Sequence, residues 1–213
     1  MTAGVPRVYL VTDRRATNGR PLAEVVARAL EGAGGHASSV AVQLREKDLD
    51  ARSLLNLARD LRAVTAAWGA RLFVNDRVDV ALAAGADGVH LGGGALAPLE
   101  IRPLAPHLQL AASTHSAAEV IRHGDAGWLS FVVFGPVFET PSKRPFGPPL
   151  GLPALRDACT AGLPVLAIGG LDGERARACR AAGASGVAVI RAVLAADDPG
   201  RAMGSFFGAI EST

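Results

Sequence analysis

Cysteine, aromatic residues and net charge are all scarce in this chain, and each scarcity argues against a class of protein. The two cysteines, Cys159 and Cys179, form no CxxC motif and have no partnering histidine, which argues against a disulfide framework or a cysteine metal site. We interpret both as small apolar fillers of helices in a reducing cytosol. The 22 lysine and arginine residues against 20 acidic ones give a net charge of +2, so no basic face is expected for nucleic acid.

Long hydrophobic runs are also absent. No apolar run reaches the roughly 18 residues that a membrane-spanning helix needs, and the N-terminus has no hydrophobic region of a signal peptide. We therefore expect a soluble, cytoplasmic protein that makes no use of a membrane. Apolar mass itself is plentiful, at 49% of the residues, and alanine, valine, leucine and glycine supply it. This composition is typical of helices that pack closely on a buried parallel sheet.

The apolar residues fall into short runs that alternate with longer stretches of helical period. Most runs lack polar alternation, so both faces of their sheet should be buried. Roughly eight strand–helix units of about 25 residues predict an α/β fold, a single (β/α)8 TIM barrel over residues 1–213. A doubly wound open sheet is the alternative, disfavoured because no GxGxxG follows the first run. The expected strands are 7–12, 39–44, 71–74, 88–91, 109–112, 128–134, 164–168 and 186–190, and the expected helices include 21–31, 50–68, 116–123 and 172–182.

Polar residues follow the second expected strand, at the end where a barrel carries its chemistry. The sequence there is Gln43-Leu44-Arg45-Glu46-Lys47, and a period of two puts Gln43, Arg45 and Lys47 on one face. An arginine fork beside a lysine point charge suits a diphosphate. The alternative is a solvated polar turn that is paired locally through Glu46.

The third and sixth expected strands are also followed by polar residues. Asn75 and Asp76 end the third, where Asp76 can hold Mg²⁺ through a carboxylate oxygen while a diphosphate supplies further ligands. The alternative for Asp76 is a helix N-cap. After the sixth strand, Thr140 and Lys143 offer anion contacts on a proline-stiffened loop that should lie over the mouth. Lys143 is equally compatible with a solvated loop lysine.

Two glycines, Gly169 and Gly170, follow the seventh expected strand. Their bare backbone N–H groups can approach a phosphate, with the dipole of the next helix behind them. The eighth strand ends beside them at Ile190 and Arg191, and the loops after these two strands are the usual phosphate site of a barrel. His90, inside an apolar strand, is interpreted as a core histidine with satisfied hydrogen bonds.

These residues together resemble those of the thiamine-phosphate synthase family and of its sister family, the TenI-type thiazole tautomerases. The resemblance covers nearly the whole chain and rests on an ordered set of motifs at residues 9–13, 43–47, 75–76, 87–92, 113–116, 135–138 with Thr140 and Lys143, and 167–170. It implies a transferase of small phosphorylated substrates. A hydroxymethylpyrimidine diphosphate would lose diphosphate, and the nitrogen of a thiazole phosphate would attack the exposed methylene to give thiamine phosphate.

The resemblance also assigns roles to individual residues. The diphosphate would be held by Arg45, Lys47, Asn75 and Lys143, and the implied catalytic residues are Arg45, Lys47 and Lys143. Mg²⁺ would bind Asp76. The pyrimidine side would contact Gln43 and Ser113, and the thiazole phosphate would bind Thr140, Gly169, Gly170, the backbone around Ile190, and Arg191.

Two departures from the family pattern bear on this reaction. Where the family continues Gln-Glu-Asp after His-Leu-Gly, this chain has Gly93-Gly94-Ala95, and Ala95 cannot serve as the second Mg²⁺ ligand. With Asp76 as the remaining carboxylate, we expect a weakened Mg²⁺ site. Arg191 replaces a small hydroxyl residue, and this change is expected to alter the phosphate pocket.

These departures keep two alternatives open. A TenI-type tautomerase is expected to carry a histidine where this chain has Pro136, so His115 or another group would have to move protons. A non-catalytic protein that binds thiazole phosphate or thiamine phosphate on the same barrel is the other alternative. The oligomeric state also stays open, with a homodimer as one option.

Overall fold

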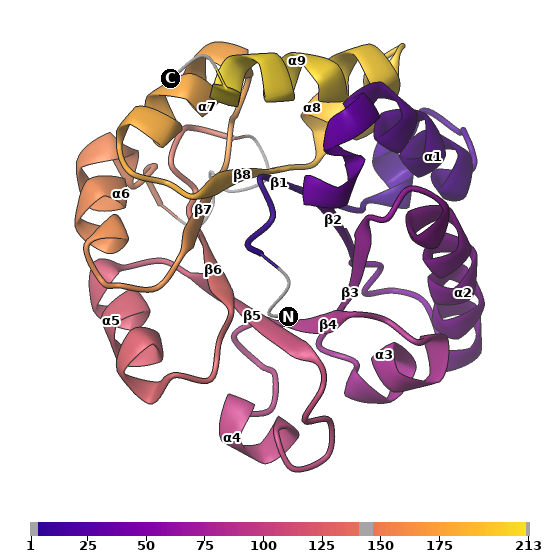
Figure 1. Ribbon diagram of the computed structural model, residues 1–213, viewed down its shortest axis with the longest axis horizontal. Helices are drawn as coiled ribbons and strands as arrows, with labels where there is room; N and C mark the ends of the chain where they lie inside the picture. The colour runs from indigo at the N-terminus through magenta and orange to yellow at the C-terminus, as the bar shows by residue number, and fades with distance from the viewer. Residues whose placement is uncertain (1–3, 141–146, 212–213) are drawn as a thin grey trace.

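The computed structural model of the chain describes residues 4–140 and 147–211 and forms a closed barrel of parallel strands surrounded by helices (Figure 1). Each strand pairs with its neighbour in sequence, and the last closes against the first. The strands are β1 (Val8–Val11), β2 (Val40–Leu44), β3 (Arg71–Asn75), β4 (Gly88–Leu91), β5 (Gln109–Thr114), β6 (Phe131–Phe134), β7 (Val165–Ile168) and β8 (Gly186–Val189). The helices are α1 (Leu22–Ala33), α2 (Ala51–Ala67), α3 (Val78–Ala84), α4 (Pro98–Ile101), α5 (Ala117–Ala126), α6 (Gly151–Cys159), α7 (Gly173–Ala181), α8 (Arg191–Leu194) and α9 (Pro199–Glu211), with short 3₁₀ helices at Arg14–Ala16 and Gly34–Ser39.

The predicted (β/α)8 barrel is confirmed. The open-sheet alternative is wrong, because β1 pairs with β8 in parallel, with Val8 opposite Val187. Strand positions agree with the expected runs, and the differences lie at the ends. The strand expected over 128–134 begins only at Phe131, and β5 extends beyond its expected end to Thr114.

Side-chain caps fix the starts of several helices, α2 and α5 among them. The Asp50 carboxylate accepts a hydrogen bond from the Ser53 N–H at 3.0 Å and begins α2, and the Ser116 hydroxyl accepts one from the Glu119 N–H at 3.3 Å and begins α5. Both residues stand immediately before helical periodicity in the sequence. Among the described residues, no helix combines the length and the apolar character needed to cross a membrane.

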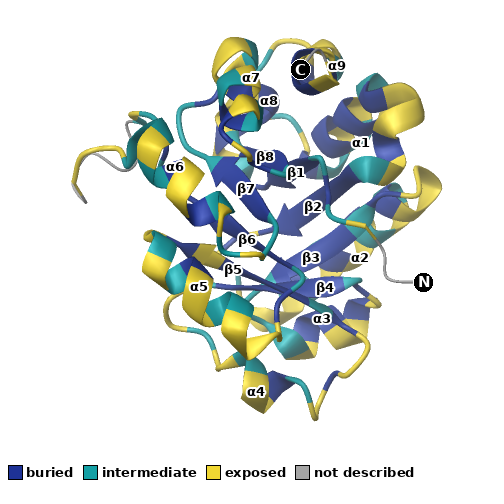
Figure 2. Cartoon of the chain, turned by 60° about the vertical axis from the view of Figure 1, so that its left-hand side comes forward, coloured by how far each residue is buried: buried dark blue, intermediate teal, exposed yellow. Residues whose placement is uncertain are grey.

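Aromatic rings fill the lumen of the barrel. Tyr9, Phe73 and Phe131 meet edge to face, with ring centroids 5.4 to 5.6 Å apart, and all three are fully buried. A second and larger apolar layer lies between the strands and the surrounding helices, which turn their dark blue, buried sides inward in Figure 2. The barrel is therefore a packed core rather than a pore.

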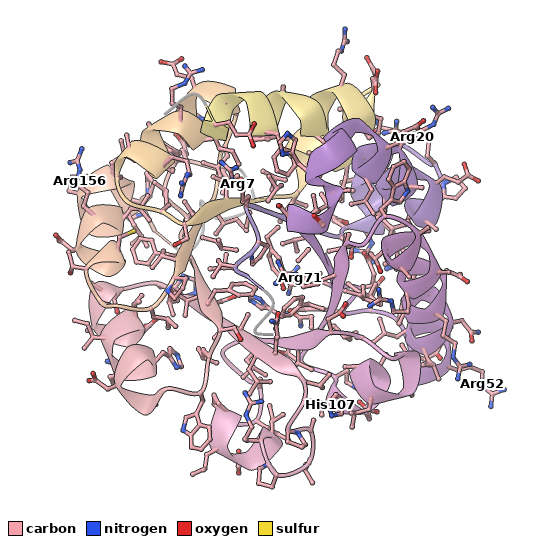
Figure 3. The ribbon with its side chains drawn as sticks, in the orientation of Figure 1. Arg7, Arg20, Arg52, Arg71, His107 and Arg156 are labelled. Atoms are coloured by element: carbon pink, nitrogen blue, oxygen red, sulfur yellow. The ribbon has the colours of Figure 1, made fainter. Side chains whose placement is uncertain are left out.

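Residues 4–7, which precede β1, cross the end of the barrel where the strands begin (Figure 1). The carbonyl of Gly4 accepts a hydrogen bond from the guanidinium of Arg71, the first residue of β3, and Val5 packs against the lumen cluster. Figure 3 shows Arg71 near the centre of the barrel, whereas Arg52 and Arg156 project from the outer helices. This end of the barrel is covered, and the polar residues that follow the strands lie at the opposite end.

Candidate active site

A chain of hydrogen bonds joins the ends of β2, β3 and β4. The side-chain amide of Gln43 donates to Asn75 Oδ1 at 2.8 Å, and the Asn75 amide donates to Asp76 Oδ2 at 2.7 Å. The backbone N–H of Gly92 completes the chain by donating to Asp76 Oδ1 at 2.7 Å. Three of the predicted site residues therefore lie together. Gln43 is 2% exposed, its nitrogen is used inside this chain, and no donor among the described residues reaches its Oε1, which leaves that atom as an acceptor.

Asp76 turns its carboxylate toward Gly92 rather than toward a helix. Its φ of 59° lies in the left-handed region, which Asp and Asn adopt more readily than other non-glycine residues. The following helix, α3, has Arg77 at its N-cap position, so the interpretation of Asp76 as an N-cap is wrong. A Cβ on Gly92 would lie 3.2 Å from Asp76 Oδ1, so glycine leaves room for this contact.

Asp76 alone supplies too few oxygen ligands for a hard cation, so a bound molecule would have to supply others. Ala95, where the family resemblance implies a second carboxylate, donates its N–H to the Gly92 carbonyl at 3.1 Å and so lies one turn from the residue that holds Asp76. Within the part of the chain that the structure describes, no group of three or more His, Cys, Asp or Glu residues is placed to hold a metal ion. A divalent cation at Asp76 would complete its shell with diphosphate oxygens and water.

Arg45 and Lys47 follow β2 as two exposed cations. The backbone N–H of Arg45 donates to the Thr12 hydroxyl at 2.9 Å, which fixes the start of the turn. Glu46 is 6% exposed, and its carboxylate accepts hydrogen bonds from the N–H and the guanidinium of Arg14, both at 3.0 Å. The alternative of a turn paired locally through Glu46 is therefore wrong. No described carboxylate forms an ion pair with Arg45 or Lys47.

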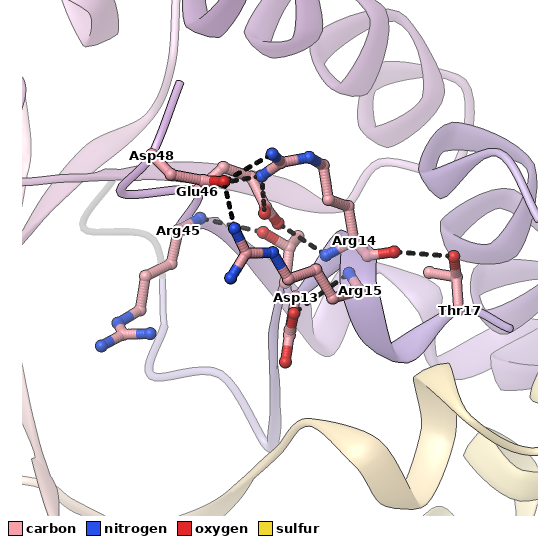
Figure 4. Close-up of polar contacts among 8 residues, drawn as sticks. Asp13, Arg14, Arg15, Thr17, Arg45, Glu46 and Asp48 are labelled. Atoms are coloured by element: carbon pink, nitrogen blue, oxygen red, sulfur yellow. Dashed lines mark hydrogen bonds and ion pairs between the residues drawn. The ribbon is translucent and has the colours of Figure 1, made fainter. Parts of the chain in front are cut away.

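A cluster of ion pairs holds this turn against the loop after β1 (Figure 4). Arg14 donates to both carboxylate oxygens of Asp48 at 2.6 Å, and Arg15 reaches the same carboxylate at 2.7 Å. Hydrogen bonding to Arg14 holds the pKa of Asp48 well below its ordinary value. We name Arg14, Arg15, Glu46 and Asp48 the β1–β2 clamp. The guanidinium of Arg45 points away from the clamp (Figure 4), because the acidic groups of the turn already have partners.

Beneath the mouth, His90 of β4 connects a buried tyrosine to an exposed serine. Its Nδ1 lies 3.3 Å from the Tyr9 hydroxyl, and its Nε2 lies 2.9 Å from Ser113 Oγ. Burial, and secondarily the charge of Arg45, lowers the pKa of His90 to about 3. The prediction of a core histidine with satisfied hydrogen bonds is confirmed. Ser113 itself is exposed near the end of β5.

The two glycines after β7 present backbone N–H groups that no described acceptor receives. Gly169 and Gly170 have φ angles of 108° and 63°, which favour glycine. A Cβ on Gly169 would lie 2.7 Å from Pro136, and one on Gly170 would collide with the carbonyl oxygen of Glu139. Glycine is therefore required by the packing of the β6 loop as well as by a close ligand. The Asp172 carboxylate caps α7 by accepting a hydrogen bond from the Arg175 N–H, and the predicted role of the α7 dipole stays a prediction.

The other predicted contacts of the thiazole phosphate follow β6 and β8. Thr140 is half-buried and lines a depression of about 350 Å³ with Phe138 and neighbouring loop residues. Ile190 packs against the lumen cluster, and Arg191 begins α8 with its side chain exposed. Lys143 lies outside the described residues, so its predicted role stays a prediction.

Three residues of this arrangement were not indicated by the sequence. Tyr9 is the single tyrosine of the chain and lies inside an apolar strand, a signal that could have marked a buried hydroxyl in need of a partner. Arg14 and Asp48 lie among other charged residues, and nothing in the sequence pairs one with the other.

Comparisons of the sequence and the structure with known proteins show which proteins this chain is similar to. The sequence matches the family model for thiamine monophosphate synthase over residues 8–193. A thiamine-phosphate synthase of Roseiflexus sp. strain RS-1 is 44% identical over 208 residues, which cover 96% of this chain and 85% of the relative. That of Roseiflexus castenholzii is 42% identical over 193 residues, covering 90% and 82%. Among solved structures, a thiamine phosphate pyrophosphorylase from Pyrococcus furiosus superposes with a TM-score of 0.86 at 35% identity, covering 97% of this chain and 96% of that one.

Proposed function

The chain belongs to the thiamine monophosphate synthase family, and we propose that its barrel mouth carries out the synthase reaction, joining a hydroxymethylpyrimidine diphosphate to a thiazole phosphate. The products are thiamine phosphate and diphosphate. One observation carries the proposal: Arg45 and Lys47 have no described carboxylate partner, while Glu46 between them is bound by Arg14. Such a pair of cations suits a diphosphate leaving group.

The reaction breaks one bond and forms another at the methylene of the pyrimidine substrate. The carbon–oxygen bond breaks with both electrons leaving on diphosphate, and the pyrimidine amine stabilises the resulting cation. The thiazole nitrogen then donates its lone pair to the methylene. This scheme needs no general base, which agrees with a buried His90 that holds hydrogen bonds at both ring nitrogens. The protein has to neutralise the leaving group and hold the two rings close together.

We place the pyrimidine ring on the floor of the mouth, against Gln43 and Ser113. Arg45 and Lys47, beyond the strand ends, then bind the diphosphate, and the arginine fork can contact two of its oxygens at once. Asn75 and Lys143 are the further proposed donors. Because the clamp fixes the turn that carries the two cations, little ordering is needed when the diphosphate binds.

Enzymes of this family generally use Mg²⁺. Asp76 is the carboxylate that would hold it here, since it is fixed beside the proposed diphosphate site by Gly92 and Asn75. When bound, the ion would neutralise charge on the diphosphate oxygens. With Ala95 in place of a second carboxylate, the affinity of this chain for Mg²⁺ should depend strongly on bound diphosphate.

The thiazole phosphate is proposed to bind after β7 and β8. The backbone N–H groups of Gly169 and Gly170 have no acceptor among the described residues, and we propose that Thr140 and the backbone around Ile190 contact the same phosphate. Arg191 adds a positive charge at the start of α8. We propose that it contacts the phosphate in place of the hydroxyl residue usual in the family.

The tautomerase alternative receives no support from the geometry. Pro136 stands where a proton-carrying histidine is expected, and His115 Nδ1 is engaged with the carbonyl of Gly135 at 2.6 Å. The ring is thus held through Nδ1 against the residue that follows β6.

A direct assay tests the proposal. The purified chain is incubated with both substrates and Mg²⁺, and thiamine phosphate and diphosphate are measured. Arg45→Ala and Lys47→Ala should each weaken binding of the pyrimidine diphosphate by at least about tenfold, whereas Arg59→Ala on α2 serves as a matched charge control. Absence of product at stoichiometric enzyme would overturn the synthase proposal. Binding of thiazole phosphate without turnover would then identify a binding protein.

A further inference from the structure

We propose that Tyr9 and His90 are positioning residues that orient the Ser113 hydroxyl, so that it donates its hydrogen into the mouth toward an acceptor atom of the substrate. This inference rests on the proposed function, in which a pyrimidine ring nitrogen is that acceptor. The inference gives the direction of each hydrogen bond in the series Tyr9–His90–Ser113, which crosses the lumen from β1 through β4 to β5.

The direction of these hydrogen bonds is determined at the buried end of the series, by Tyr9. Tyr9 is 0% exposed, and its hydroxyl hydrogen needs an acceptor because an unsatisfied buried O–H is costly. Among the described residues, the acceptor within reach is His90 Nδ1, at 3.3 Å. Burial also keeps the phenol protonated, since it raises the pKa of Tyr9. Tyr9 therefore donates and His90 Nδ1 accepts.

The imidazole of His90 determines the direction of the next hydrogen bond, the one to Ser113. A neutral imidazole carries one N–H, and with Nδ1 accepting, the hydrogen is on Nε2. His90 Nε2 lies 2.9 Å from Ser113 Oγ and so donates to it. No described carboxylate contacts the ring, and Arg45 is the charged group that acts on it, so nothing favours an imidazolium with two donors.

Ser113 ends the chain as a donor. Its oxygen already accepts from His90, so its own hydrogen points to another acceptor, and no described residue provides one. The side chain is exposed at the mouth, so a bound molecule is the available partner. Gln43, whose nitrogen is held by Asn75, presents the complementary acceptor from β2. A donor and an acceptor on the same floor match an aminopyrimidine, which carries acceptor ring nitrogens beside a donor amine.

A double-mutant cycle tests the inference. Tyr9→Phe removes one hydroxyl and keeps the ring that packs on Phe73 and Phe131. We expect kcat/KM for the pyrimidine diphosphate to fall about tenfold in Tyr9→Phe and at least as much in Ser113→Ala. The double variant should be no worse than Ser113→Ala, because Tyr9 acts through Ser113. Independent, multiplying losses would overturn the inference.

A control and a second readout keep the test decisive. Thr65→Val removes another buried hydroxyl, one that bonds to the Arg62 carbonyl on α2, and should leave kcat/KM unchanged. Nitrogen–proton NMR of the full chain, assigned with His90→Gln, should show hydrogen on Nε2 of His90 in the wild type and a loss of this preference in Tyr9→Phe. Hydrogen on Nδ1 in the wild type would overturn the inference even if no substrate is turned over. An inactive wild type with hydrogen on Nε2 would count against the proposed function alone.

Discussion

Asp76 accepts a hydrogen bond from the backbone N–H of Gly92 at 2.7 Å, so the residue that follows β4 orients the carboxylate that follows β3. The same carboxylate accepts from Asn75 through its other oxygen. A carboxylate held at both oxygens is oriented before any cation arrives, which reduces the ordering needed for metal binding. In the proposed reaction, this arrangement supplies the one carboxylate available to Mg²⁺, since Ala95 stands where the family resemblance implies a second.

Restoring that carboxylate should change the Mg²⁺ requirement. Ala95→Asp places a second oxygen ligand one turn from Gly92 and should lower the Mg²⁺ concentration for half-maximal synthase activity by about tenfold. Asp76→Asn should raise it by at least as much. Both are measured by titrating Mg²⁺ at saturating substrates, with Asp79→Asn on α3 as the control. An unchanged Mg²⁺ requirement in Ala95→Asp would show that position 95 does not face the metal.

The β1–β2 clamp should matter for substrate binding rather than for stability alone. Arg14→Ala removes the contacts to Glu46 and Asp48 and frees Glu46 to pair with Arg45 and Lys47, while Asp48 keeps its ion pair with Arg15. KM for the pyrimidine diphosphate should rise about tenfold, while KM for the thiazole phosphate stays within about twofold. Arg28→Ala, which breaks a surface pair on α1, is the control. Equal rises in both KM values would point to general loosening of the fold.

Gly170, the second of the two glycines after β7, offers a test of backbone geometry. Gly170→Ala places a Cβ against the carbonyl oxygen of Glu139 at a φ of 63°, so it should cost about 2 kcal/mol or more of stability and weaken thiazole phosphate binding. Gly162→Ala is a matched control, because it shares a positive φ, 74°, but meets no atom within 4 Å. Thermal unfolding and KM for the thiazole phosphate are measured in both. Equal losses of stability would show that the collision is relieved by a loop shift.

Acid should destabilise the folded chain through His90. Its folded pKa of about 3 lies below the ordinary value of 6.5, so between these values the unfolded chain binds the extra proton and stability falls as pH falls. From pH 7 to pH 5 this contribution amounts to about 2 kcal/mol. Urea unfolding without substrate should show a loss smaller by about that amount in His90→Gln than in the wild type. Parallel losses in the two proteins would contradict a depressed pKa.

The barrel and much of its mouth were predictable from sequence for a physical reason. In a closed parallel barrel every strand ends at the same opening, so Gln43, Asn75 and Ser113 are brought to one region once the strands are recognised. Strand β4 was predicted with its observed bounds because turn residues flank its apolar run. The start of β6 was missed, because the apolar residues Trp128 and Leu129 continue the character of the strand, whereas the register with β5 begins at Phe131, preceded by one hydrogen bond from the Ser130 N–H to the Leu110 carbonyl.

Contacts between distant segments were beyond the reach of such reasoning. Arg14 and Asp48 are 34 positions apart, and their pairing depends on how closely the loops after β1 and β2 approach. Tyr9 and His90 are 81 positions apart and meet only because the barrel closes and turns both side chains into the lumen. Neither the residue types nor their spacing in the sequence shows that the members of each pair lie close together in space.

The covered far end of the barrel has a kinetic consequence. The N-terminal segment and the rings of Tyr9, Phe73 and Phe131 close that side, so the mouth is a dead end with a single opening. If the pyrimidine ring lies on the floor as proposed, it has to enter before the thiazole that covers it, and the joined product has to leave before the next pyrimidine can enter. With the substrates placed as proposed, we therefore expect ordered binding, with the pyrimidine substrate first.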